Sequence, residues 1–267
     1  MTDSDPQFSG RVAVITGGGS GIGRSIAARY AAGGGTVAVL GRRPEPLAET
    51  VDLIRAAGGQ AAAFPVDVRD YEQVSAATEA VRDRFGRIDS LVNNAAGNFV
   101  CPGEQLSAGG WRAVIDIVLN GSFHCTRAVS ETMLAQGSGS VLSVIASYAW
   151  HGHPGTVHSA AAKAGVLAMT RTLAVEWADR GVRLNCIAPG PTETAGAGAA
   201  LWGDAESRER VLASVPQRRM AGPGEIADVA AFLLDERARY VTGEVLTVDG
   251  GQWLGKQVYG TPLAAIR

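Results

Sequence analysis

The chain has 267 residues, of which 46% are hydrophobic and 19% are charged, and its formal net charge is −2. This composition is typical of a soluble globular protein, and it excludes a general attraction to nucleic acid or to an anionic membrane surface. Three cysteines lie far apart in the sequence and suggest neither a disulfide framework nor a metal-binding pair, so we expect no metal ion. Because no apolar run is long enough to span a membrane and the polar N-terminus does not resemble a signal peptide, we expect a cytoplasmic protein.

Apolar segments of strand length alternate with helical segments along the chain. The predicted strands cover residues 11–16, 36–41, 61–68, 88–97, 140–146, 182–190 and 244–251. The predicted helices cover residues 21–34, 46–59, 71–86, 111–135, 156–181 and 223–235, and a loop with a helical excursion occupies residues 191–221. Apolar strands joined by helices form a parallel sheet that is covered on both faces. The pattern therefore predicts one α/β domain over residues 1–267, with a doubly wound, Rossmann-type, seven-stranded parallel sheet.

A glycine-rich turn, TGGGSGIG at residues 16–23, joins the first predicted strand to the first predicted helix. In doubly wound sheets, ligands bind beyond the carboxyl ends of the strands, and glycines at this turn let a pyrophosphate approach the helix N-terminus. The sequence therefore predicts a dinucleotide site. The residues of the turn that we expect to contact the cofactor are Gly17, Ser20, Gly21, Ile22 and Gly23.

The residues after the second and third predicted strands indicate which dinucleotide binds. NAD sites usually carry an acidic residue after the second strand, whereas this chain has Gly41, Arg42 and Arg43 there. Guanidinium groups bind a 2′-phosphate, so we predict NADP(H); the alternative is that both arginines only solvate the start of the next helix. Asp67 and Val68 are placed to meet the adenine ring, and the alternative for Asp67 is a cap on the helix that follows.

Five short motifs together resemble the short-chain dehydrogenase/reductase superfamily. They are TGxxxGxG at 16–23, NNAAG at 93–97, Lys163 in a helix of small residues, PGPTET at 189–194 and VDGG at 248–251. The resemblance extends from about residue 10 to residue 251, and it implies the Rossmann-type fold and a nicotinamide cofactor. It also implies cofactor contacts outside the glycine-rich turn. These are expected at Asn94, Ala95, Lys163, Pro189, Gly190 and Thr192.

The catalytic positions of the superfamily are changed in this chain. In most members a tyrosine four residues before the lysine is the proton donor or acceptor, and a serine and an asparagine complete the set. The matching positions here hold Ser159, Ala146 and Val118. A serine hydroxyl is a far weaker acid than a phenol, whose ordinary pKa is about 10, and would protonate an alkoxide poorly. The chain therefore either lacks activity or catalyses a reaction in which hydride does not go to a carbonyl carbon.

The same substitution occurs in one subgroup of the superfamily, the 2,4-dienoyl-CoA reductases, which the strings NNAAGNF, DIVLNG, SxxxKAG and APGP also resemble. The resemblance implies that hydride from NADPH goes to the far end of a dienoyl-CoA thioester in the β-oxidation of unsaturated fatty acids. The negative charge then spreads to the thioester oxygen, and protonation of the α-carbon leaves a 3-enoyl-CoA. On the matching positions, Tyr148 and Asn98 are expected to hold the thioester oxygen as an oxyanion hole, while Ser159 and Lys163 support the cofactor and a water.

Other interpretations of these residues remain open. Tyr148 could be a buried aromatic side chain, and Asn98 could only turn its loop. The chain could be a carbonyl or enoyl reductase of secondary metabolism that uses Tyr148 or His158 as an unusual acid. It could also be a non-catalytic NADP(H)-binding protein. The sequence does not give the acyl chain length, nor whether the substrate is a CoA ester.

Two further expectations concern regions outside the catalytic positions. The Ala- and Gly-rich composition of residues 195–210 predicts a lid within about 191–221 that orders when substrate binds. The superfamily resemblance implies a homotetramer in which the two longest helices pack against neighbouring subunits.

Overall fold

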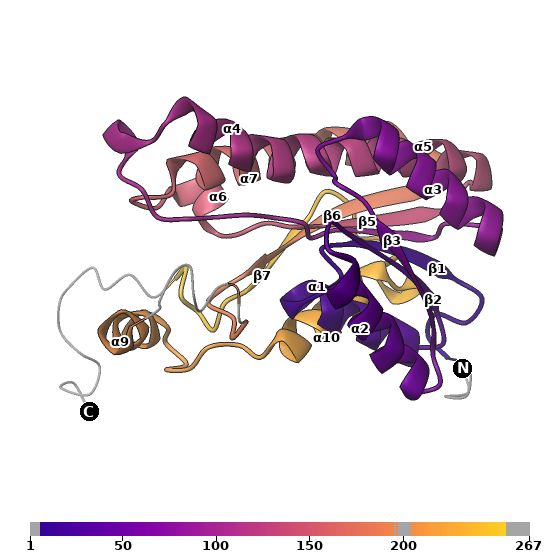
Figure 1. Ribbon diagram of the computed structural model, residues 1–267, viewed down its shortest axis with the longest axis horizontal. Coiled ribbons are helices and arrows are strands. Elements are labelled where there is room, and N and C mark those ends of the chain that lie inside the picture. Colours follow the sequence, from indigo (N-terminus) through magenta and orange to yellow (C-terminus); the bar gives the residue numbers. More distant parts are fainter. Residues whose placement is uncertain (1–5, 195, 197–203, 255–267) are drawn as a thin grey trace.

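Seven parallel strands form one sheet in the order β3-β2-β1-β4-β5-β6-β7 (Figure 1). The computed structural model describes residues 6–194, 196 and 204–254. The strands are β1 (Val12–Thr16), β2 (Thr36–Gly41), β3 (Gln60–Pro65), β4 (Ser90–Asn93), β5 (Gly139–Val144), β6 (Val182–Pro189) and β7 (Val245–Val248). The order reverses direction after β3, where the chain crosses from the first half of the sheet to β4 beside β1. The predicted seven-stranded, doubly wound sheet is confirmed.

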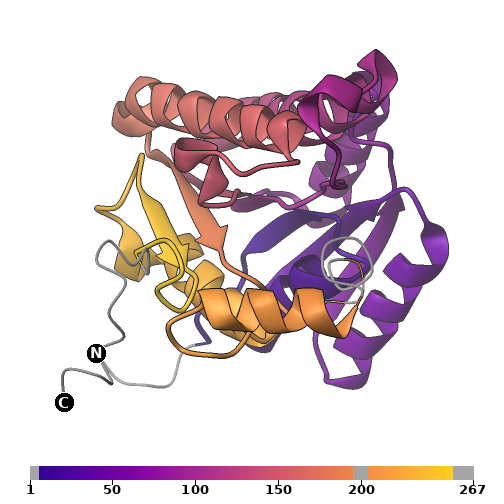
Figure 2. The ribbon, with the colours of Figure 1, turned by 90° about the vertical axis from the view of Figure 1, so that its left-hand side faces the viewer.

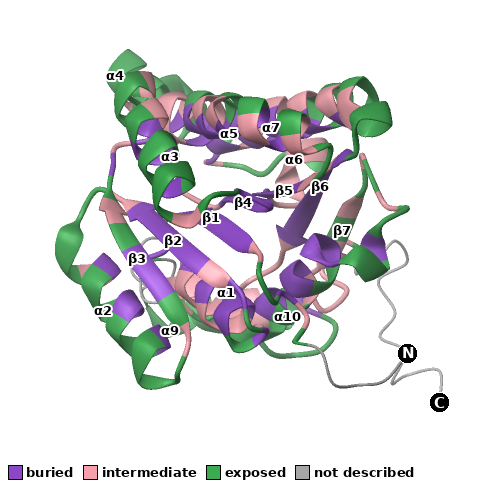
Figure 3. Ribbon diagram, turned by 90° about the vertical axis from the view of Figure 1, so that its right-hand side faces the viewer, coloured by how far each residue is buried: buried purple, intermediate pink, exposed green. Residues whose placement is uncertain are grey.

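Helices cover both faces of this sheet (Figures 1 and 3). One face carries α1 (Gly21–Ala32), α2 (Pro44–Ala56) and α10 (Pro223–Leu234), and the other carries α3 (Tyr71–Phe85), α5 (Gly121–Gln136) and α7 (Val157–Trp177). The remaining α-helices are α4 (Ala108–Ile115), α6 (Tyr148–His151) and α9 (Ala205–Ser214). The short 3₁₀ segments are η1 (Gly103–Gln105), η3 (Ala178–Arg180) and η4 (Glu236–Ala238). None of the helices in the described part of the chain is long and apolar enough to cross a membrane.

The continuously apolar strands are explained by two cores, one on each side of the sheet. In β1, Ala13 and Ile15 pack in the core beneath α1 and α10, while Val12 and Val14 pack in the core beneath α3 and α5. The side chains of a strand alternate between the two faces of its sheet, so a strand covered on both faces is apolar at most of its positions. Burying a side chain of this size fully contributes roughly 1.5–3 kcal/mol. These cores fix the carboxyl ends of the strands as a rigid edge.

The prediction of one regular helix over residues 111–135 is wrong. A π-helical turn, η2 (Asp116–Asn120), separates α4 from α5. The helix passes close to the loop after β3, because a Cβ atom on Gly121 would lie 2.7 Å from Cγ2 of Val68. Asn120 Nδ2 donates to Asp116 Oδ1 over 2.8 Å and closes the wider turn. π-turns are frequent at functional sites, and this one lies at the edge where the strands end.

Several predicted strands extend too far, and one helix was not predicted. The strands predicted at 61–68, 88–97 and 244–251 leave the sheet at Pro65, Asn93 and Val248. The residues beyond these ends form loops at the carboxyl edge, so they are free to line a site. The four-residue helix α6 begins soon after β5 and carries Tyr148.

The region of the predicted lid is described only in part. Residues 195 and 197–203 lie outside the described residues. Helix α9 occupies the later part of the region and lies beyond the carboxyl edge of the sheet (Figure 2). A parallel bridge between Thr192 and Ala221 brings the two ends of the excursion together. Closure of a lid over substrate stays a prediction.

Candidate functional site

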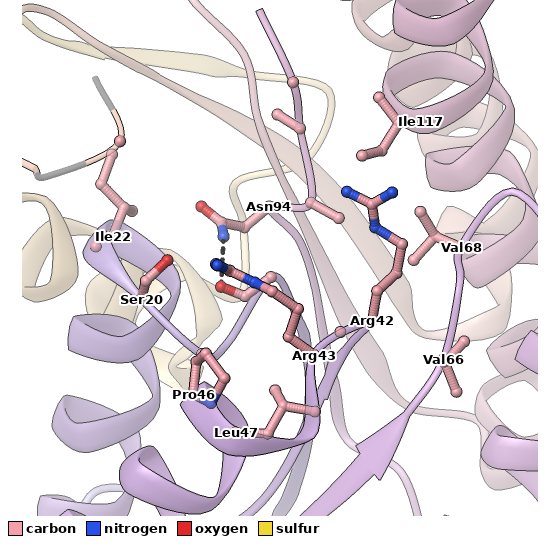
Figure 4. Close-up of a pocket in the computed structure, with 18 of the residues that line it drawn as sticks. Ser20, Ile22, Arg42, Arg43, Pro46, Leu47, Val66, Val68, Asn94 and Ile117 are labelled. Atoms are coloured by element: carbon pink, nitrogen blue, oxygen red, sulfur yellow. Dashed lines mark hydrogen bonds between the residues drawn. The ribbon is translucent and has the colours of Figure 1, made fainter. Parts of the chain in front are cut away.

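A cavity of about 530 Å³ opens at the carboxyl ends of β1, β2 and β4, where the order of the sheet reverses (Figure 4). This volume is in the usual range for small-molecule and cofactor sites. The sequence-predicted residues that line it are Gly17, Ser20, Gly21, Ile22, Arg42, Arg43, Asp67, Val68, Asn94, Ala95 and Asn98. Residues that the sequence interpretation did not name as contacts also line it. These are Gly19, Gly41, Pro46, Leu47, Val66, Ala96, Gly97, Ile117, Thr194 and Gly196.

The glycine-rich turn at the base of the cavity is packed too closely for any larger residue. Gly17 has a φ of 62°, in the left-handed region that favours glycine. A Cβ on Gly23 would lie 2.3 Å from the carbonyl oxygen of Gly17 and 2.5 Å from Asn94 Nδ2. Asn94 Nδ2 donates to the carbonyl oxygen of Thr16 over 3.1 Å, while Thr16 Oγ1 accepts from the backbone N–H of Asn94 over 3.0 Å. Asn94 therefore holds the turn open from β4, while Gly23 itself lies behind the cavity wall.

The start of α1 suits a bound phosphate. Ser20 is the N-cap residue, and its side chain makes no capping hydrogen bond to the helix. The first turn of α1 contains no acidic residue. The free backbone N–H groups and the positive end of the helix dipole therefore favour an anion at this point.

Two arginines carry positive charge to the rim of the cavity. Arg42 and Arg43 follow β2, and neither forms an ion pair with another described residue. Figure 4 shows Arg42 extending on the side of Val68 and Ile117, whereas Arg43 lies on the side of Ser20. Their position beside the end of β2 fits a 2′-phosphate, because a guanidinium group binds phosphate through paired hydrogen bonds. The turn, the helix start and these arginines together fit NADP(H).

Asp67 lines the cavity but is held by a neighbour. The Arg69 guanidinium donates to both carboxylate oxygens, and this hydrogen bonding lowers the pKa of Asp67. Asp67 does not cap the following helix, since the side chain of Asp70 accepts from the backbone N–H of Gln73 and is the N-cap of α3. Contact of Asp67 and Val68 with adenine stays a prediction.

Four other predicted cofactor residues do not line this cavity. Lys163 lies in α7, and Pro189, Gly190 and Thr192 lie at the end of β6. Thr192 is buried, and its Oγ1 donates to the carbonyl oxygen of Gly190 over 3.0 Å. The end of β6 packs directly against Asp249 of the VDGG turn, so these residues form the border between the cofactor cavity and the C-terminal segment.

Tyr148 and Ser159 are brought together by α6 and α7. Tyr148 Oη lies 3.0 Å from Ser159 Oγ, within hydrogen-bonding distance. Burial raises the pKa of Tyr148, and the hydrogen bond with Ser159 opposes this rise. The phenol therefore keeps its proton. When the serine hydroxyl donates to the phenol oxygen, the phenol O–H is available for a substrate oxygen.

Lys163 lies one helical turn after Ser159. Its ammonium group is buried, and Nζ donates to the carbonyl oxygen of Val144 at the end of β5 over 2.5 Å. Burial lowers the pKa of Lys163 to about 8, and the nearby Cys186 thiol opposes this shift. At neutral pH the lysine is charged, and it places a cation between the strand that leads to Tyr148 and the helix that carries Ser159.

Asn98 presents an amide donor from the loop after β4. Its Oδ1 accepts the backbone N–H of Phe99 over 2.9 Å. A backbone N–H can only donate, so the atom that faces it is the amide oxygen, and Nδ2 points elsewhere. Nδ2 makes no hydrogen bond to another described residue, and Asn98 lines the cofactor cavity. The N–H groups of Nδ2 therefore have no acceptor among the described residues.

The two other changed positions of the superfamily set are apolar. Val118 lies in the π-turn and is buried in the same core as Ile145, Ala162 and Val166. Ala146 follows β5 directly and has no polar group. Neither can replace the missing serine or asparagine, so the polar groups that meet here are those of Tyr148 and Ser159.

The two histidines that follow β5, His151 and His153, contact different groups. His151 Nε2 lies 3.2 Å from Ser147 Oγ, and its ring stacks on Trp253. His153 Nδ1 lies 2.9 Å from the carbonyl oxygen of Pro154. Within the described ranges, no group of three or more His, Cys, Asp or Glu side chains could hold a metal ion.

The family of this chain follows from comparison with known proteins. The family model described as enoyl-(acyl carrier protein) reductase matches residues 17–252, and the chain belongs to this family of short-chain dehydrogenases and reductases. A protein of Bacillus subtilis named "probable 2,4-dienoyl-CoA reductase [(2E)-enoyl-CoA-producing]" is 48% identical over 91% of this chain and 97% of its own length. A Danio rerio protein named "peroxisomal 2,4-dienoyl-CoA reductase [(3E)-enoyl-CoA-producing]" is 37% identical over 92% of this chain and 83% of its own length.

Solved structures agree with the fold. A short chain dehydrogenase from Bacillus anthracis is 44% identical, with a TM-score of 0.84 over 95% of this chain and 99% of that one. A Beutenbergia cavernae protein, described as a putative NAD(P)-dependent gluconate 5-dehydrogenase with bound NADP, is 39% identical. Its TM-score is 0.88 over 94% of this chain and 100% of that one.

Proposed function

We propose that the chain is an NADPH-dependent reductase of 2,4-dienoyl-CoA thioesters. The observation that carries the proposal is the hydrogen bond between Tyr148 and Ser159, because it brings a phenol from α6 to the side chain at position 159 of α7. The Asn98 donor and the named activities of the Bacillus subtilis and Danio rerio relatives support it. The bound NADP of the Beutenbergia cavernae structure and the fit of Arg42 and Arg43 support the cofactor.

When bound, NADPH supplies hydride to the far end of the diene. The protein must then stabilise negative charge on the thioester oxygen. Tyr148 donates its phenol proton toward that oxygen, and Asn98 donates through Nδ2. Each such donor in an oxyanion hole contributes on the order of 10²–10³ in rate. Ser159 donates to the phenol oxygen and keeps the phenol proton directed at the substrate.

Lys163 contributes through its charge. Its buried ammonium lies between β5 and α7, close to the groups that meet the thioester, and its field is weakly screened by water. A positive charge there favours the anionic thioester oxygen and the hydride-donating end of the cofactor. A water supplies the proton that completes the reaction and leaves as hydroxide, and Ser159 Oγ holds this water by accepting a hydrogen bond from it.

The first experiment is a spectrophotometric assay of NADPH oxidation with 2,4-hexadienoyl-CoA, with crotonyl-CoA and a simple ketone as comparison substrates. We expect turnover of the dienoyl thioester. Turnover of only the ketone or the monoenoyl thioester would favour a carbonyl or enoyl reductase. Cofactor binding by calorimetry without turnover of any of the three would favour a binding protein.

The position of the new proton defines the product. Protonation of the α-carbon leaves a 3-enoyl-CoA, whereas protonation of the γ-carbon leaves a 2-enoyl-CoA. We propose the 3-enoyl product, because a water held by Ser159 on the side of the thioester lies nearer the α-carbon than the γ-carbon. The Danio rerio relative is named for this product, whereas the Bacillus subtilis relative is named for the (2E)-enoyl product. Reduction in D₂O followed by NMR tests this, since deuterium at the γ-carbon would contradict it.

We propose that the protein assembles as a homotetramer. Phe123 on α5 and Val175 on α7 are exposed on the outer layer of helices, and Val175 is 81% exposed. Tyr240 and Leu246 are exposed near the edge strand β7. Apolar side chains of this size on two separate surfaces fit two kinds of subunit contact.

A cytoplasmic location stays a prediction, which cell fractionation tests.

A further inference from the structure

The loop that carries Asn98 packs against the segment that leads into α7. The backbone N–H of Cys101 donates to the carbonyl oxygen of Gly155 over 2.9 Å. Val100 also lies on this glycine, since a Cβ on Gly155 would be 2.8 Å from Val100 Cγ1. The Phe99 ring lies against the His158 ring, with centroids 4.3 Å apart and planes inclined at 33°. We call residues 98–101, Gly155 and His158 the clasp.

His158 is the buried half of the clasp. It lies in the first turn of α7 beside Ser159 and is 0% exposed. Neither ring nitrogen has a hydrogen-bond partner among the described residues. Burial lowers the pKa of His158, which keeps the imidazole neutral, and an interaction with the backbone of Phe99 opposes this shift. Buried polar groups usually have hydrogen-bond partners, so the burial of this imidazole needs another explanation. The ring of His158 packs against the ring of Phe99.

The clasp connects this contact to the candidate oxyanion hole. Phe99 is the residue whose backbone N–H orients the Asn98 carboxamide. His158 precedes Ser159, which bonds Tyr148. The Phe99 ring therefore lies on the loop that carries the Asn98 donor. The His158 ring lies on α7, whose Ser159 side chain bonds the Tyr148 donor. The contact therefore joins the loop of one donor to the helix that bonds the other.

We propose that His158 is a positioning residue that holds the Asn98 donor in register with Tyr148 through the Phe99 ring. This proposal rests on the proposed function of the site. The ring, not its nitrogens, performs this role. Misplacement of a donor by about 1 Å costs up to about 100-fold in rate, so loss of the ring is expected to be visible in kcat.

The kinetic test compares the kcat of His158→Ala with that of His158→Phe. It also compares the Asn98→Ala variant with the double variant that carries His158→Ala and Asn98→Ala. We expect His158→Ala to lower kcat about tenfold or more, with the Kd for NADPH unchanged. His158→Phe should restore most of the activity, because it keeps an aromatic ring against Phe99. In the Asn98→Ala background, His158→Ala should have little further effect, because the donor that it positions is already absent. Val157→Ala, an exposed neighbour in the same helical turn, is the matched control.

Two kinetic results would overturn the proposal. Equal damage by His158→Phe and His158→Ala would show that a ring nitrogen is required. Fully additive effects of His158→Ala and Asn98→Ala would show that His158 acts independently of Asn98. If His158→Ala does not fold, Phe99→Ala removes the same contact from its exposed side and is expected to give the same loss of kcat and the same dependence on Asn98.

A second measurement needs no substrate, so it separates this proposal from the proposed function. Amide hydrogen exchange of residues 98–101 should be faster in His158→Ala than in the wild type, and close to the wild type in His158→Phe. Unchanged exchange in His158→Ala would overturn the proposal even if the enzyme reduces dienoyl-CoA. Faster exchange in a protein that does not reduce dienoyl-CoA would support the clasp and reject only the proposed substrate.

Discussion

Tyr148 is the residue on which the proposed chemistry depends. Its phenol stays protonated because it is largely buried, and the hydrogen bond to Ser159 orients it. We expect Tyr148→Phe to lower kcat with 2,4-hexadienoyl-CoA by about 10²–10³, the usual effect of losing one oxyanion donor. Ser159→Ala should have a smaller effect, since the phenol itself remains. Both are measured by NADPH absorbance, and an unchanged kcat for Tyr148→Phe would remove the phenol from the mechanism.

The buried lysine gives the folded protein a defined pH dependence. Burial lowers the pKa of Lys163 from 10.5 to about 8, so between these values the unfolded chain binds more protons than the folded one. The stability of the wild type relative to Lys163→Met should therefore rise with pH across this window. Below about pH 8 the difference should be constant, because the lysine is charged in both states. Urea unfolding of both proteins without cofactor tests this, and a difference that falls between pH 8 and 10.5 would contradict it.

At the residue scale, the sequence predicted the identity of candidate site residues better than the hydrogen bonds and packing contacts that position them. Four-residue spacing places Ser159 and Lys163 on one face of a helix, and the structure has them one turn apart. The partner of Lys163 in the described structure, the carbonyl oxygen of Val144, depends on how α7 crosses β5. The buried imidazole of His158 likewise has no sequence signal, because its significance comes from Phe99, far away in the chain.

The glycine-rich turn after β1 is the element that most constrains the cofactor site. A methyl group at Gly23 would meet the carbonyl oxygen of Gly17 and the amide of Asn94. Gly23→Ala should therefore displace the turn, raise the Kd for NADPH at least tenfold by calorimetry and destabilise the fold by about 1–3 kcal/mol. Gly224→Ala is the matched control. Its Cβ would meet no atom within 4 Å, so binding should be unchanged.

The elements themselves show where sequence patterns stop being informative. Apolar runs predicted every strand, because most positions of a strand buried on both faces are apolar. The π-turn at η2 was not predictable, since the helical pattern continues through it and the extra residue reflects packing of Gly121 against Val68. Ile117 enters the cavity through this turn, so it could not be named in advance. Helix α6 is four residues long, too short for any periodic signal.

At the scale of the whole molecule, the exposed apolar residues predict assembly. Val175→Glu on α7 should convert the proposed tetramer into smaller species, because a buried unpaired carboxylate is unfavourable at a subunit contact. Leu53→Glu on α2 is the control, since Leu53 is exposed away from these surfaces. Size-exclusion chromatography with light scattering measures both. A monomeric wild type, or a tetramer that persists in Val175→Glu, would reject this assembly.

The placement of Tyr148 on α6 rather than α7 separates two inherited parts of the enzyme. The helix that carries Ser159 and Lys163 can stay constant while the turn after β5 changes its acid. Ketone chemistry would then need more than one change, because the Tyr148 hydroxyl lies 3.0 Å from Ser159 Oγ, in the space that a larger side chain at position 159 would enter. Engineering in that direction must therefore remove the phenol at position 148 together with installing one at position 159.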